Sequence, residues 1–261
     1  MATKLASSKF KLALLAGSVL ALGLSTGCST TAQTTDRQGN PVVTETEISD
    51  PFESFNRGVF AFNQGFDNMI LHPVLEGYRA VVPDPAREGV SNFMSNLKSP
   101  VHFANQVLQG DIGGAATVLQ RAIINTLLGF GLFDVAGKEG IEAEAEDFGQ
   151  TLAVWGVGHG PYIVVPFLGP SSLRDYVGYA VDAFADPLRL YLFNTDQEGW
   201  AWARAGVDYL VLRDSLMDTL KDLEKSSVDY YAATRSIYVQ RRAAMVADST
   251  SASEDIPDYD E

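Results

Sequence analysis

Two adjacent serines and a nearby histidine are the residues best placed for hydrolytic chemistry. Ser171 or Ser172 would be the nucleophile, His159 the base and Asp175 the acid that orients the base. Neither serine lies in a Gly-x-Ser-x-Gly elbow, and helix capping explains a serine directly before an apolar helical run. An esterase that uses Ser171 or Ser172 with His159 is therefore the weaker alternative, and we expect no catalytic residue.

The histidines and the glycine-rich segment give no metal or nucleotide site. His72, His102 and His159 are isolated, without a His-x-x-x-His or His-Glu-x-x-His spacing. The run from Gly156 to Pro161 begins like a dinucleotide fingerprint, but Pro161 stands where the third glycine belongs and no βαβ pattern surrounds it. The acids between Glu139 and Asp147 are typical of a solvated face. We expect no metal and no cofactor.

Composition excludes further classes of function. The 261 residues include 19 Lys and Arg against 33 Asp and Glu, a formal net charge of -14. A surface that acidic repels phosphate backbones, so nucleic acid is not an expected partner. The single cysteine, Cys28, cannot form an intramolecular disulfide or a thiolate cluster.

The beginning of the chain has the pattern of an export signal. Lys4, Lys9 and Lys11 precede 13 uncharged residues, 12–24, which are too few to span a bilayer. Ser25-Thr26-Gly27-Cys28 then resembles a bacterial lipobox, although Ser25 stands where leucine is usual. We expect residues 1–27 to be a lipoprotein signal peptide and Cys28 to be acylated. An ordinary signal peptide with a leftover thiol is the alternative.

The remaining chain divides into three parts. Residues 28–49 are rich in Thr, Ser, Gln and Glu and are expected to form a flexible tether. Residues 247–261 form an acidic tail that is expected to be disordered. The folded domain is then 50–246, and helical spacing of its apolar residues makes it mainly α.

Several helices are expected within that domain. A stripe of Phe52, Phe55, Val59, Phe62 and Phe66 predicts a first helix, with a core face favoured over a lipid-binding stripe. Capping residues and prolines then predict four more helices. One begins at Asp84-Pro85, and the next begins at Ser99-Pro100 and ends at Gly110. A third covers 112–128, and a fourth begins at Ser171 or Ser172 and ends at Asp186-Pro187. The last two helices are expected at 200–223 and 229–246, and a short strand at 162–167.

Two stretches without charge suggest a membrane or a buried channel. Residues 122–133 are 12 uncharged residues, a helix of ~18 Å that is close to one leaflet's share of the hydrocarbon core. We interpret this segment as entering one leaflet and turning back at Gly129 and Gly131; a core helix with a loop is the alternative. Residues 148–173 also lack Asp, Glu, Lys and Arg, but five glycines and three prolines exclude a spanning helix. That stretch could line a water-filled cavity, or form a loop buried under the helices.

Short motifs follow one another in order through these segments. The most specific are Gly158-His159-Gly160-Pro161-Tyr162 and Leu173-Arg174-Asp175. The other motifs are Asp50-Pro51-Phe52-Glu53, Phe55-Asn56-Arg57, Pro85-Ala86-Arg87, Gly89-Val90-Ser91-Asn92-Phe93, Asn96-Leu97, Leu108-Gln109-Gly110, Arg121 with Asn125-Thr126, 131–136 and 146–152. Together these motifs resemble the MlaA (VacJ) family of outer-membrane lipoproteins. The resemblance covers about Asp50 to Pro187, and the C-terminal helices only loosely.

The resemblance implies a single helical, ring-like domain, embedded in the inner leaflet of the outer membrane of a Gram-negative bacterium, with an amphipathic central channel. It implies removal of mislocalised phospholipids from the outer leaflet and their delivery to a periplasmic phospholipid carrier, with a trimeric outer-membrane porin as partner. A purely structural lipoprotein is the other alternative. We expect the channel to be lined by Gly156, Gly158, His159, Gly160 and Tyr162, and the leaflet to hold Leu128, Phe130, Leu132 and Phe133.

Overall fold

The structure is a computed structural model that describes residues 32–35, 41–44 and 48–251. The expected signal peptide, Cys28 and most of the expected tail lie outside the described residues. Within the region expected to be a tether, β1 (Ala32–Thr35) and β2 (Pro41–Thr44) pair as antiparallel strands. Threonine and valine favour extended backbone, which accounts for strands where a tether was expected.

The described domain is mainly helical, as predicted. Its helices are α2 (Glu53–Phe66), the π-helix η1 (Asp67–Leu71), α3 (His72–Val81), α4 (Asp84–Gln109), α5 (Ile112–Leu127), α6 (Val135–Lys138), α7 (Phe148–Val154), α8 (Leu173–Ala185), α9 (Pro187–Asn194), α10 (Glu198–Ser226) and α11 (Tyr230–Ser251). Strands β3 (Tyr162–Val165) and β4 (Gly169–Ser172) pair antiparallel.

Local capping signals set most of these boundaries. Gly110 ends α4 in the left-handed conformation, with φ 84°. The Asp111 side chain accepts a hydrogen bond from Gly114 N–H and so caps α5, and Ser172 caps α8 by accepting from Asp175 N–H. The prediction of a new helix at Ser99-Pro100 is wrong, because α4 continues through Pro100. A proline removes one backbone donor from a helix, and the long packing interface of α4 with α5 offsets that loss.

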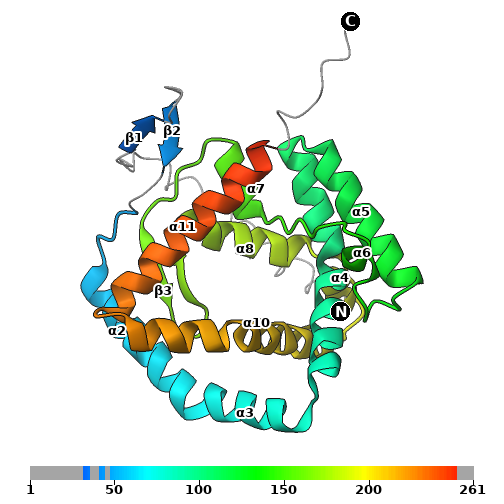
Figure 1. The fold of residues 1–261 in the computed structure, drawn as a ribbon, viewed down its shortest axis with the longest axis horizontal. Helices are drawn as coiled ribbons and strands as arrows, with labels where there is room; N and C mark the ends of the chain where they lie inside the picture. Colours follow the sequence, from blue (N-terminus) through cyan, green and yellow to red (C-terminus); the bar gives the residue numbers. More distant parts are fainter. Residues whose placement is uncertain (1–31, 36–40, 45–47, 252–261) are drawn as a thin grey trace, which may run out of the picture.

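The helices are arranged in a ring-like frame (Figure 1). Helices α2 and α3 follow the left and lower sides of the outline, α4 and α5 the right side, and α11 the upper left, while α8 and α10 lie inside it. The frame closes through contacts of α7 with α8 and α11, and of α10 with α4, α9 and α11. Helices α7 and α8 approach closely at two glycines, since a Cβ on Gly178 would lie 2.2 Å from Gly149 N.

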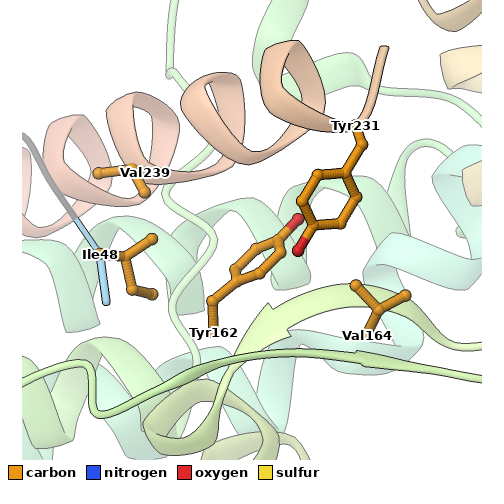
Figure 2. Packing of buried hydrophobic residues seen from close by; sticks show 5 residues of the cluster. All are labelled: Ile48, Tyr162, Val164, Tyr231 and Val239. Atoms are coloured by element: carbon orange, nitrogen blue, oxygen red, sulfur yellow. The ribbon is translucent and has the colours of Figure 1, made fainter. Parts of the chain in front are cut away.

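A cluster of buried hydrophobic residues lies where β3 meets α11. It consists of Ile48, Tyr162, Val164, Tyr231 and Val239 (Figure 2). The rings of Tyr162 and Tyr231 make an edge contact, with centroids 6.0 Å apart. Ile48 belongs to this core, so the folded domain begins slightly before the expected residue 50.

Many large apolar side chains are exposed in the described part of the chain. The favoured interpretation of the first helix as a core face is wrong for Phe52, Phe55 and Phe62, which are all more than half exposed. A helical apolar stripe identifies one face of a helix but not what covers that face. Within the described part of the chain, no helix has the length and apolar character needed to cross a membrane.

Candidate functional site: a central cavity between α4, α8, α9 and α10

A cavity of about 490 Å³ lies between four helices of the frame. Helical spacing explains which residues reach it, because positions three and four apart share a helix face. On α10 these are Ala201, Arg204, Ala205, Asp208, Tyr209 and Leu212; on α4 they are Lys98, Val101 and His102. Helix α8 contributes Asp175, Tyr176, Tyr179, Asp182 and Ala183, and α9 contributes Arg189.

The cavity wall is amphipathic. Alanines and the side chains of Val101, Leu168, Pro170 and Leu212 form its apolar part. Tyrosines and ionised groups form the rest, and most of the ionised groups are already paired. Arg204 lies 2.8 Å from Asp186, and Lys98 Nζ lies 3.0 Å from Asp208. Such a wall offers polar partners to a headgroup without excluding alkyl chains.

A second cavity of about 210 Å³ adjoins the first. The two share Asp147, Ser171, Asp175, Tyr179 and Asp182 in their walls, and the second adds Tyr238 and Arg242 from α11. The shared residues place α8 between the two spaces. The polar lining therefore extends from α10 past α8 to α11.

Arg242 forms ion pairs with two carboxylates in the wall of the second cavity. Its side chain is 8% exposed, and Nη1 donates to Asp147 Oδ2 at 2.6 Å while Nε lies 2.8 Å from Asp175 Oδ2. Burial alone would raise the pKa of Asp175, but Arg242 and Arg174 outweigh it and hold that pKa below its ordinary value. The Tyr238 hydroxyl also donates to Asp175, and burial beside this carboxylate raises the pKa of Tyr238 to about 12. Asp175 is therefore a buried carboxylate bound by three side chains.

Two other lining groups have shifted pKa values. Burial lowers the pKa of His102, whose Nδ1 lies 2.6 Å from the Glu146 carbonyl oxygen, so the imidazole is neutral at pH 7. Burial raises the pKa of Asp182, although hydrogen bonds from Phe148 N–H and the Asn105 amide act to lower it.

The five residues expected to line a channel lie outside both cavities. Tyr162 is 0% exposed and packs in the core, and His159 is buried. Gly156, Gly158 and Gly160 are exposed on the segment before β3. Alternation along β3 turns Tyr162 and Val164 inward. Later residues of the same uncharged stretch, Leu168, Pro170 and Ser171, do line the larger cavity. The cavity residues of α10 could have been found from the sequence, because small and charged residues recur along that helix at helical spacing.

The four residues expected to contact lipid are exposed on the surface of the chain. Leu128 is 67% and Phe130 is 78% exposed, and Leu132 and Phe133 are also exposed. They lie in the turn after α5, where Phe130 and Gly131 both have positive φ. Exposed apolar side chains in such a turn are what a leaflet contact requires, and the contact itself stays a prediction.

The serines of the esterase alternative have structural contacts. Ser172 is fully buried and its Oγ caps α8. Ser171 Oγ lies 3.4 Å from the Tyr238 hydroxyl oxygen. Among the described residues, no group of three or more His, Cys, Asp or Glu side chains is arranged to hold a metal ion.

Comparison with known proteins agrees with this architecture. A family model described as MlaA lipoprotein matches residues 48–245. The intermembrane phospholipid transport system lipoprotein MlaA of Escherichia coli is 39% identical over 231 residues, 86% of each chain. An uncharacterized protein of Rickettsia felis is 39% identical over 77% of this chain and 79% of its own. A solved structure described as the structural basis for maintenance of bacterial outer membrane lipid asymmetry matches with TM-score 0.67 and 38% identity, covering 76% of this chain and 99% of that chain. The chain belongs to the MlaA lipoprotein family.

Proposed function

We propose that this protein is an outer-membrane lipoprotein that removes mislocalised phospholipids from the outer leaflet and passes them to a periplasmic lipid carrier. The observation that carries the proposal is the amphipathic cavity between helices of the ring, in a chain that exposes many large apolar side chains. Membership of a family named for phospholipid transport supports it. The protein thereby maintains the lipid asymmetry of the outer membrane.

The cavity suits the headgroup part of this transfer. Moving a phosphate through hydrocarbon without partners costs several kcal/mol or more, so a transporter must provide a polar path. Tyrosines and paired charges on α4, α8 and α10 supply such a path. We therefore assign the headgroup path to this cavity and not to the segment 156–162.

The exposed apolar side chains suit a position in the inner leaflet. Exposed large apolar side chains occur on α2, α3, α5 and α9 and in the turn after α5. Contiguous exposed apolar surface marks a site of contact with lipid or with another protein. Part of this surface would contact lipid, and part would contact a trimeric outer-membrane porin that holds the protein next to the outer leaflet.

Deletion of the gene followed by complementation tests the function. Outer-leaflet phospholipid should rise on deletion and return to its original level with the wild-type chain. Ala205→Trp places a large ring in the cavity and should keep phospholipid near the deletion level. Ala203→Trp on the same helix lies outside the lining and should complement fully.

A third variant separates the cavity from the segment 156–162. A Cβ added to Gly158 would meet no heavy atom within 4 Å, so Gly158→Trp should fold and complement. If Gly158→Trp blocks transfer while Ala205→Trp does not, the path runs along 156–162 instead. Unchanged outer-leaflet phospholipid on deletion would favour a purely structural lipoprotein. Loss of function in Ser171→Ala alone would favour the esterase.

Anchoring is part of the same proposal. An acylated Cys28 would hold the protein in the membrane, because each buried CH₂ contributes ~0.8 kcal/mol. Mass spectrometry of the mature chain should find a diacylglyceryl or triacyl Cys28 at its N-terminus. Cys28→Ala should yield uncleaved or soluble protein, and an unmodified Cys28 in membranes would contradict the anchor.

A further inference from the structure

Arg189 differs from the other cationic residues of the cavity wall. Lys98 and Arg204 pair with carboxylates there. Arg189 lines the same cavity from α9, and among the described residues its guanidinium has no carboxylate partner and no side-chain hydrogen bond. The cavity therefore contains an arginine whose positive charge is not neutralised by the part of the chain that the structure describes.

Aromatic rings hold Arg189 in place without neutralising its charge. Its Cζ lies 5.4 Å from the ring centroid of Phe193 and 5.5 Å from that of Trp202, and these two rings meet edge to face at 6.3 Å. Contact with ring faces restrains the guanidinium electrostatically and leaves its N–H groups available as donors. The arrangement is suited to an anionic ligand with several acceptor oxygens.

The position of Arg189 points to the origin of that ligand. Trp202, which contacts the guanidinium, is 63% exposed, and Tyr191 on the same helix as Arg189 is also largely exposed. Tyrosine and tryptophan are enriched where a membrane meets water, which is also the level of lipid phosphates. Arg189 thus lies on the cavity wall beside aromatic residues typical of the headgroup region.

We propose that Arg189 binds the phosphodiester group of a phospholipid as the lipid enters the central cavity. Arginine suits this task because its planar donors match phosphate oxygens. This proposal rests on the proposed function and adds the residue that recognises the shared part of all phospholipid headgroups. Arg189 would then distinguish phospholipids from lipids without phosphate, and it would not distinguish one phospholipid headgroup from another.

Equilibrium binding to the mature acylated protein in a nonionic detergent tests this proposal. The probes are phosphatidylglycerol and diacylglycerol that carry the same fluorescent acyl chain, and anisotropy reports binding. Wild type should prefer the phospholipid. Arg189→Gln should weaken phospholipid binding about tenfold, as expected for one hydrogen bond to a charged group, and leave diacylglycerol binding unchanged.

Matched variants separate charge, fold and position. Arg241→Gln removes the same charge from an exposed site on α11 outside both cavities and should bind both probes like wild type. Arg189→Lys keeps the charge and should lose less affinity than Arg189→Gln. Wild-type affinity of Arg189→Gln for phosphatidylglycerol, or an equal loss for both probes, would overturn the proposal.

Two further measurements complete the test. One asks whether the bound phosphate belongs to a lipid or to a soluble anion, and the other covers the case that Arg189→Gln folds poorly. Millimolar inorganic phosphate should not displace the fluorescent phospholipid, and displacement would assign Arg189 to a soluble anion. If Arg189→Gln has a lower melting temperature than wild type, Phe193→Leu is the second variant. It keeps the arginine but removes one of the rings that restrain it, and it should weaken only phospholipid binding. Wild-type protein that binds neither probe would count against the proposed function itself, whereas binding that is insensitive to Arg189 would overturn only the present inference.

Discussion

At the scale of single residues, the cavity wall depends on a few buried charges that neutralise one another. Arg242 on α11 joins Asp147, which precedes α7, to Asp175 on α8. A buried ion pair adds little stability compared with a well-packed apolar pair, but removal of one partner leaves an uncompensated charge. Arg242 therefore matters because it is the cation beside Asp147 and, with Arg174, one of two beside Asp175.

Arg242→Met should destabilise the fold by about 1–3 kcal/mol, because it leaves Asp147 without its cation and Asp175 with Arg174 alone. Thermal unfolding followed by circular dichroism in detergent would measure the loss. Arg241→Met, at the exposed neighbouring position, should change the free energy of unfolding little. Equal melting temperatures for the two variants would contradict the assigned role of Arg242.

His102 should make the stability depend on pH. Burial lowers its pKa from 6.5, with smaller effects from the Glu146 carbonyl, Lys98 and Asp147. The unfolded chain therefore takes up a proton at a pH where the folded chain resists one, and stability falls as the pH drops below 6.5. In His102→Gln this part of the decline should disappear, as measured by unfolding curves at a series of pH values. Parallel pH dependence in both proteins would show that His102 does not contribute.

At the scale of elements, two asparagines on one face of α2 hold the hairpin of β3 and β4 against the frame. Asn56 is fully buried, donates to the Tyr162 carbonyl oxygen at 3.0 Å, and accepts from Val164 N–H at 3.0 Å. Asn63, two turns later, donates to the Val165 carbonyl oxygen and accepts from Phe167 N–H. These side-chain amides satisfy the edge of β3 in place of another strand.

Asn56→Leu should cost about 2–4 kcal/mol, because it leaves one backbone donor and one backbone acceptor buried without a partner. Differential scanning calorimetry in detergent would measure the loss as a lower melting temperature. The matched variant Asn68→Leu changes an exposed residue of η1 and should melt like wild type. A wild-type melting temperature for Asn56→Leu would mean that α2 does not hold the hairpin.

At the scale of the whole molecule, a cavity with paired charges occurs in a chain that exposes many large apolar side chains. The central cavity contains ion pairs and tyrosines as well as apolar side chains such as Leu212. Exposed Phe, Leu, Trp and Ile side chains occur on most helices. Such exposure marks surfaces that contact lipid or another protein, which agrees with a function in lipid transfer.

Single cysteines can map the lipid contact, because Cys28 is the only natural cysteine. Cysteines at Leu128, Phe130 and Phe133 should react slowly with a water-soluble maleimide in intact outer membranes, since lipid shields them. A cysteine at Lys221, a charged exposed position on α10, should react rapidly. After membrane disruption the slow positions should become reactive. Rapid labelling of all positions in intact membranes would place the turn after α5 in water.

The sequence by itself determined what depends on neighbours along the chain. Gly110, Asp111, Ser172 and Asp186-Pro187 set helix ends through their own hydrogen bonds and dihedral preferences, and the structure has those ends. Periodicity likewise identified α2, α5, α10 and α11. The family motifs also identified the family, because they lie in order along one chain.

Only the tertiary structure decided which faces are buried, exposed or turned toward the cavity. The phenylalanine stripe of α2 has the periodicity of a core face, yet much of it is exposed, and Tyr162 in an uncharged segment is buried away from the cavities. Arg189 and Arg204 have the same charge, but within the described chain only Arg204 has a carboxylate beside it. The reason is that burial and pairing depend on residues distant in sequence, which the period of one helix cannot specify.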